Sequence, residues 1–228
     1  MVDRLTTRQL NRATLARQLL LERADCSAEQ VLQHLVGMQS QAPLAPYVGL
    51  WTRVVNFRAD ELSALMIERR AVRASLMRAT IHLVIAADFL DLWPVLAPVS
   101  ERGLWTGSPF GRRVPREIVD DLLAFAQNLL AEAPRTRAEL RRLLGQRWPK
   151  LDADAMAYAA QYLLPIVQVT PRGVWGGGPR RRPGPMRNPG SVAGCRPARP
   201  LMTSYYAISA PSARRRSRTC RSGRASPA

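Results

Sequence analysis

The sequence predicts a mainly α-helical fold with small β-wings, arranged as tandem winged-helix domains and followed by a disordered C-terminal tail. Three observations lead to this prediction. Helix-capping residues precede apolar residues at helical spacing, a short segment with alternating side chains follows the third predicted helix, and the same order of elements returns later in the chain. The composition then changes abruptly near residue 176.

The first unit is expected over residues 1–100 and begins with three helices. Thr6 or Thr7 caps a first helix that runs to about residue 22. Its apolar residues near one face are Leu10, Ala13, Leu20 and Leu21. Ser27 and Gln30 form a capping box that begins a second helix, which stops near residue 37. Asp60 caps a third helix with Leu62, Leu65 and Met66 as its apolar residues.

A small hairpin is expected after these helices. Residues 72–84 alternate with a period of two, which predicts one or two short strands. Three helices followed by a hairpin correspond to a helix-turn-helix with a β-wing. Beyond it, a short helix from residue 88 to 96 should break at Pro94, and residues 101–114 read as a linker or loop.

The second, smaller unit is expected over residues 115–175. Pro115 should open a long amphipathic helix, because Ile118, Leu122, Phe125 and Leu129 recur at helical spacing. A second capping box, formed by Thr136 and Glu139, and a helix from residue 152 to 164 follow. Residues 166–169 and 174–175, separated by a turn, should then form a second wing.

The basic charge of the protein is concentrated in the tail. The net charge is +17, but residues 1–175 carry 22 Lys and Arg against 17 acids, which gives only +5. Residues 176–228 carry 12 Arg and no acid, and they show no amphipathic period. One interpretation is a disordered basic tail that touches nucleic acid.

A frameshift near residues 176–181 is the second interpretation of the tail, and the one we favour. Reading the third base of each codon with the next two bases allows acids, helix caps and a helical apolar period to return. The nucleotide sequence tests this hypothesis, which fails if the codons forbid those residues.

The remaining composition limits the compartment and the cofactors. Cys26, Cys195 and Cys220 have neither metal-ligand nor redox spacing, so we expect a cytoplasmic protein without a metal or other cofactor. The N-terminus lacks an apolar signal core, and no apolar run is long enough to span a membrane.

Two glutamines are the strongest candidates for a site. Gln39 and Gln41 follow an apolar helix and precede Pro43 and Pro46, which cannot continue that helix. In an extended backbone, side chains two residues apart share a side, so both amides can point into one place. Alternatively, both amides satisfy backbone groups at the helix end and in the proline turn.

The chain over residues 1–175 resembles the HTH_42-type winged-helix DNA-binding proteins, whose characterised members are crosslink-repair DNA glycosylases of the AlkZ/YcaQ type. The matching segments are R-A-T-L-A-R-Q-L-L-L at 12–21, G-M-Q-S-Q-A-P at 37–43, P-Y-V-G-L-W-T-R at 46–53, L-M-R-A-T-I-H-L-V at 76–84 and P-R-G-V-W at 171–175. The frame-shifted tail also looks like the continuation of this family.

The resemblance implies a function and a set of site residues. A glutamine-x-glutamine motif marks the active site of the family and corresponds to Gln39 and Gln41. The residue between them is usually aliphatic in the glycosylases, but it is Ser40 here. The expected substrate is double-stranded DNA carrying N7-alkylated or crosslinked purines, and the expected protein is a monomer.

Six further residues are candidates for DNA binding. They are Arg69, Arg70, Arg73, Arg78, Thr80 and His82. Arginines would contact phosphates, which positions a protein on DNA without reading sequence. The alternatives are a solvated charged face for the arginines and a hydrogen-bonded wing histidine for His82. At the level of the whole protein, the alternatives are a non-catalytic DNA-binding or regulatory protein and an inactive frame-shifted fragment.

Overall fold

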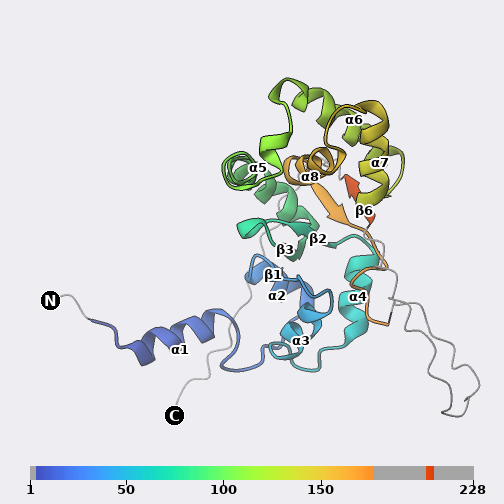
Figure 1. Cartoon of the computed structure of the whole chain (residues 1–228). Coiled ribbons are helices and arrows are strands. Elements are labelled where there is room, and N and C mark those ends of the chain that lie inside the picture. Colours follow the sequence, from blue (N-terminus) through green and yellow to red (C-terminus); the bar gives the residue numbers. More distant parts are fainter. Residues whose placement is uncertain (1–3, 177–203, 208–228) are drawn as a thin grey trace, which may run out of the picture.

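The structure is a computed structural model, which describes residues 4–176 and 204–207. It is mainly helical with one small antiparallel sheet, as predicted (Figure 1). The α-helices are α1 (Thr7–Arg17), α2 (Ala28–His34), α3 (Ala45–Trp51), α4 (Ala59–Ile67), α5 (Ala86–Arg102), α6 (Val119–Glu132), α7 (Arg137–Arg147) and α8 (Ala153–Leu163). The strands are β1 (Met38–Gln39), β2 (Ala71–Ser75), β3 (Ile81–Ile85), β4 (Arg135–Thr136), β5 (Ile166–Gln168) and β6 (Ser204–Ala207). Short helical turns are η1 (Met77–Ala79), η2 (Gly103–Gly107), η3 (Gly111–Arg113) and η4 (Arg116–Ile118).

Strands from both predicted units form a single sheet. Its order is β1-β3-β2-β5-β6-β4, and every neighbouring pair is antiparallel. Strand β2 therefore has β3 from its own hairpin on one side and β5 from the second unit on the other. In Figure 1, β1, β2 and β3 lie in the middle of the molecule, between α2–α4 and α5–α8, and β6 lies beside α7. The two units are thus joined through backbone hydrogen bonds.

The β2–β3 hairpin is covered on both faces. Leu83 and Ile85 pack on one face, in a core with residues of α2, α3 and α4. Val84 and Ala74 pack on the other face against Phe89 of α5. Because both faces are buried, alternation along these strands does not separate an inside from an outside.

Most of the predicted helix caps are confirmed. Thr6, Ser27 and Thr136 each form a complete capping box, and Asp152 caps α8. These local hydrogen bonds satisfy amide donors that the first turn of a helix leaves unpaired. Each cap lies three residues before its side-chain partner, so short-range sequence is sufficient to locate it. The predicted cap at Asp60 is wrong, because Asp60 lies inside the first turn of α4, whose N-cap is Arg58.

The first helix differs from the expectation. It ends at Arg17 rather than near residue 22, and none of its residues is buried. Leu10, Leu20 and Leu21, which were expected near one face of this helix, are 50%, 39% and 43% exposed. In Figure 1, α1 extends away from the body of the molecule. Amphipathic spacing alone therefore did not place this helix in the core.

The predicted break at Pro94 is wrong, because α5 continues through both Pro94 and Pro98. A proline inside a helix removes one backbone hydrogen bond and strains the preceding turn. Packing of Phe89, Trp93 and Leu96 against the sheet supports the helix on both sides of Pro94.

The segment predicted as a linker, residues 101–114, is also helical in part and packed. Leu104 and Val114 from this segment are buried in the core of the second unit. It therefore forms part of that unit's packing.

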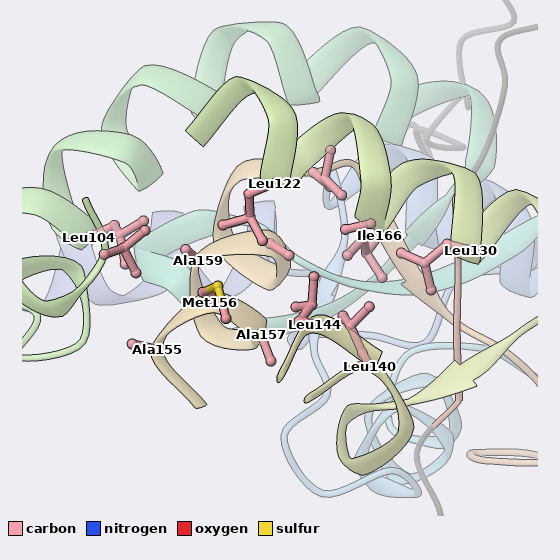
Figure 2. Packing of buried hydrophobic residues seen from close by; sticks show 14 residues of the cluster. Leu104, Leu122, Leu130, Leu140, Leu144, Ala155, Met156, Ala157, Ala159 and Ile166 are labelled. Carbon is pink, nitrogen blue, oxygen red and sulfur yellow. The ribbon is translucent and has the colours of Figure 1, made fainter. Parts of the chain in front are cut away.

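The core of the second unit is almost wholly apolar. Leu122 and Leu130 of α6 face Leu144 of α7 and Met156 of α8 (Figure 2). All four side chains are fully buried. Pro115 does not begin α6 directly, since the one-turn η4 lies between them.

Across the part of the chain that the structure describes, no helix is long and apolar enough to cross a membrane.

The second wing does not form as predicted. Residues 166–168 are a strand, but they pair with β2 and β6, and residues 174–175 are not a strand. Instead, the Tyr47 hydroxyl donates to the Gly173 carbonyl and accepts from the Trp175 amide, both at 2.9 Å. These hydrogen bonds hold the segment after β5 on the first unit.

Strand β6 falls within the tail that was predicted to be disordered, residues 176–228. It pairs with β5 and β4, so the prediction is wrong for these four residues. Residues 177–203 and 208–228, and with them the proposed frameshift, lie outside the described residues.

Candidate functional site

A glycine turn brings the two glutamines to the sheet. After α2, Gly37 adopts a φ of +128°, which side-chain-bearing residues rarely adopt, and the chain enters β1. A Cβ atom at this position would lie 2.5 Å from Cγ1 of Val84. Glycine is therefore required both for the turn and for the close approach of β1 to β3.

Gln39 and Gln41 meet the first two residues of β3. Gln39 lies directly opposite His82 in the β1–β3 register, and its side chain is exposed. Gln41 is also exposed, and its Oε1 accepts a hydrogen bond of 3.3 Å from the Ile81 amide. Both amides thus lie at one corner of the sheet, where β1 ends and β3 begins.

The predicted proline turn is followed by a helix that the sequence interpretation missed. Pro46 lies in the first turn of α3 instead of terminating structure, and Tyr47 and Leu50 of this helix are buried. Proline is well tolerated in a first helical turn, and this preference was the available signal. Helix α3 contacts β1 and so supports the two glutamines from one side.

The predicted contact of Arg73 with DNA is wrong. Its side chain is only 1% exposed, and it belongs to β2, which β3 separates from β1 in the sheet. Its guanidinium donates to Ser40 Oγ, to the Ser40 carbonyl and to Oε1 of Gln168, at 2.9, 2.6 and 2.5 Å. The charge was taken as a sign of exposure, whereas Arg73 is enclosed and bonded to protein acceptors.

The hairpin tip carries two of the other predicted residues. Arg78 is exposed, with a left-handed φ of 54°. Thr80 is half-buried, and its hydroxyl donates to the Met77 carbonyl at 3.1 Å, which stabilises the tip. Because β3 begins immediately after this tip, Arg78 and Thr80 lie near the same end of the hairpin as Gln39 and Gln41.

His82 lies beneath the surface at the same corner. Only 4% of its surface is exposed, and its Nδ1 lies 2.9 Å from the Thr80 carbonyl. Because a carbonyl oxygen only accepts, this nitrogen carries the proton and Nε2 is the acceptor in the neutral ring. The hydrogen-bonded wing histidine considered above matches this geometry, and direct contact of the ring with DNA does not.

Arg69 and Arg70 lie at the other end of β2. The five residues of β2 separate them from the tip, which corresponds to about 17 Å of extended chain. Both side chains are exposed, and Arg70 pairs with Glu29 and Glu68. The hollow beside Arg70 is lined by three glutamates, Glu29, Glu61 and Glu68, which makes it less favourable for phosphate.

The corner formed by Gln39 and Gln41 can accept hydrogen bonds from a water molecule. An amide oxygen has two lone pairs, so Gln41 can accept from Ile81 and from a second donor at once. The Gln39 amide makes no hydrogen bond with any residue that the structure describes. One amide is thus anchored on the backbone, and the other is available at the surface.

Comparison with known proteins identifies a family. The family model described as "DNA glycosylase AlkZ-like" matches residues 32–216, which include Gln39, Gln41 and the β2–β3 hairpin and extend into the tail. No curated protein matches the chain.

A solved structure, Streptomyces sahachiroi DNA glycosylase AlkZ, shares the fold. It aligns with a TM-score of 0.62 at 21% sequence identity, over 75% of this chain and 48% of that one. The present chain therefore spans about half the length of the solved glycosylase. Because the family model covers most of the sequence, the chain belongs to the AlkZ-like DNA glycosylase family.

Proposed function

We propose that this chain is a DNA glycosylase that hydrolyses the N-glycosidic bond of N7-alkylated or crosslinked purines in double-stranded DNA. The observation that carries the proposal is the exposed pair Gln39 and Gln41 at the corner of β1 and β3. Membership of the AlkZ-like family supports the reaction class.

Hydrolysis of this N-glycosidic bond needs few catalytic groups from the protein. An N7-alkylated purine is already cationic, so it leaves the sugar as a neutral base without a general acid. Water adds to the anomeric carbon as the bond to the purine breaks, and one proton passes to solvent. Orienting that water contributes several kcal/mol when the geometry is right. Gln39 and Gln41 would supply the acceptor oxygens, since an amide does not act as an ordinary base.

DNA would bind across the hairpin and the helices of the first unit. We propose that the two units act as winged-helix modules, with Arg78 contacting phosphate and Thr80 shaping the tip. Arg69 and Arg70 would reach phosphates further along the duplex. His82 would support Gln39 from below, because its ring is buried directly opposite in the register. The proposed protein is a cytoplasmic monomer, and sedimentation of the full chain tests its oligomeric state.

The test is base release from a duplex that carries an N7-alkylated guanine, measured on gels after strand cleavage at the abasic site. We expect the full-length protein to release the base, and Gln39→Ala and Gln41→Ala to be slower by at least about tenfold. Gln127→Ala, which changes an exposed glutamine on α6, is the matched control and should behave as the parent.

Two results would decide against the proposal. If the parent binds duplex but releases no base, the chain is a binding protein; if Gln39→Ala and Gln41→Ala equal the parent, the site is elsewhere.

The salt dependence of duplex binding tests the DNA contact separately. Replacing Arg78 with Gln should reduce the slope of log affinity against log salt by about one phosphate contact.

A further inference from the structure

The buried Arg73 connects the two units at the candidate site. Its Nε and Nη2 donate to the hydroxyl and carbonyl of Ser40, and its Nη1 donates to Gln168 of β5. Ser40 is itself fully buried between Gln39 and Gln41. The residue that separates the two glutamines is therefore bonded to a strand of the first unit, which is in turn bonded to the second.

Arg73 also changes the hydrogen bonding between β1 and β3. Continuing the β1–β3 register by one residue places Ser40 opposite Ile81, and the Ser40 amide donates to the Ile81 carbonyl at 2.7 Å. In a regular antiparallel pair, the Ile81 amide would donate back to the Ser40 carbonyl. Here that carbonyl accepts from Arg73, and the Ile81 amide donates to Oε1 of Gln41 instead. The Gln41 side chain thus replaces the backbone acceptor that Arg73 withdraws.

We propose that Arg73 is a positioning residue that fixes Gln41 on the Ile81 amide and makes this geometry depend on Gln168 of the second unit. Arg73 is buried, so it does not touch DNA or water at the site but acts through Ser40 and Gln41. The catalytic consequence rests on the glycosylase function proposed above, whereas the structural coupling does not.

The second unit also encloses the arginine. Gly173, five residues after Gln168, has a φ of +87°, and a Cβ atom there would lie 2.9 Å from Cδ of Arg73. The Gly173 carbonyl accepts from Tyr47 of α3. Residues 168 and 173 of the second unit therefore contact the arginine at its head and along its side chain.

The experiment compares Arg73→Met, Arg73→Lys, Gln168→Leu and Gln168→Glu in the full chain, with Arg112→Met as the control at an exposed arginine. The first readout is amide hydrogen exchange at Ile81. We expect exchange to accelerate at least about tenfold in Arg73→Met and less in Gln168→Leu. Arg73→Lys should retain part of the Ile81 protection that Arg73→Met loses, because lysine keeps a hydrogen-bond donor. Gln168→Glu should retain most of the protection that Gln168→Leu loses, because glutamate keeps the acceptor.

The second readout separates chemistry from binding. At saturating duplex, base release should fall at least about tenfold in Arg73→Met, while the duplex dissociation constant changes less than about threefold. Ser40→Ala should have a small effect, because the carbonyl that Arg73 holds belongs to the backbone. Arg112→Met should leave release and exchange unchanged.

The outcomes distinguish this inference from the proposed function. If the parent releases no base but Ile81 exchange responds as expected, the glycosylase proposal fails and the coupling stands. If exchange and release are unchanged in Arg73→Met, or in Gln168→Leu where Arg73→Met does not fold, the positioning role is overturned. A loss of duplex affinity equal to the loss of rate would also overturn it, because the effect would then be on binding.

Discussion

Two regions of the molecule bury different kinds of side chain. Around α6, α7 and α8, the fully buried residues are leucine, alanine and methionine, and the buried Thr136 is a helix cap. Around β1, β2 and β3, the protein also buries Ser40, Arg73 and His82.

Apolar burial supplies stability with little directional demand, whereas each buried polar group must have a partner in a fixed direction. The apolar core around α6, α7 and α8 therefore contributes stability through burial alone, whereas the region around β1, β2 and β3 also holds polar groups in a specific geometry.

The largest effect expected on stability comes from the apolar core. Leu144→Ala should lower the free energy of unfolding by about 2–5 kcal/mol, because the side chain is fully buried among α6, α7 and α8 and leaves a cavity. Chemical denaturation measures the change. Leu10→Ala on the exposed α1 is the same substitution at a 50% exposed position and should cost less than about 0.5 kcal/mol. Equal losses at both positions would contradict the comparison.

An intermediate effect is expected where the chain enters β1, beside the hairpin. Gly37→Ala should cost about 1–3 kcal/mol, since alanine is strained at this φ and its Cβ would clash with Val84. Gly103→Ala is the control, because Gly103 is helical and an added Cβ meets nothing within 4 Å. That variant should be neutral or stabilised by up to about 1 kcal/mol. Thermal unfolding of both proteins decides between strain at residue 37 and a general effect of losing glycine.

The smallest effect is a pH-dependent contribution from a cap of the second unit. The Thr136 amide and then the Thr136 hydroxyl donate to the Glu139 carboxylate and hold the pKa of Glu139 below its usual value. A lowered folded pKa adds stability that is fully present above the unfolded pKa and lost as pH falls through the folded one.

Glu139→Gln should therefore cost less than about 1 kcal/mol near neutral pH, because the carboxylate is partly exposed. The difference from the parent should shrink in acid. A difference that stays constant between pH 7 and pH 3 would show that the charge contributes nothing.

Local chemistry predicted much of the fold. The capping boxes at Ser27 and Thr136 and the β2–β3 hairpin depend on residues a few positions apart, and they occur where the sequence placed them. Helix α3 was missed because Pro46 was taken as a terminator rather than as a first-turn residue. The continuation of α5 through Pro94 was missed because it depends on packing against the sheet.

The candidate site was predictable only in part. The spacing of Gln39 and Gln41 indicated an extended backbone, but strand β1 ends at Gln39 and Gln41 lies in a bend two residues later. The burial of Arg73 was not predictable, because its partner Gln168 lies 95 residues away and both faces of the hairpin are covered. When both faces of a strand are buried, sequence alternation cannot show which face a charged residue lies on. It also cannot show that a hydrogen-bond acceptor lies within reach of that residue.

The pairing of β2 with both β3 and β5 has a mechanical consequence. Rotating one unit against the other would shear a ladder of backbone hydrogen bonds, so the two units should meet a duplex as one stiff body rather than closing around it like a hinge. Separating them at residues 101–114 would also leave unpaired strand edges on both pieces, which are prone to aggregate.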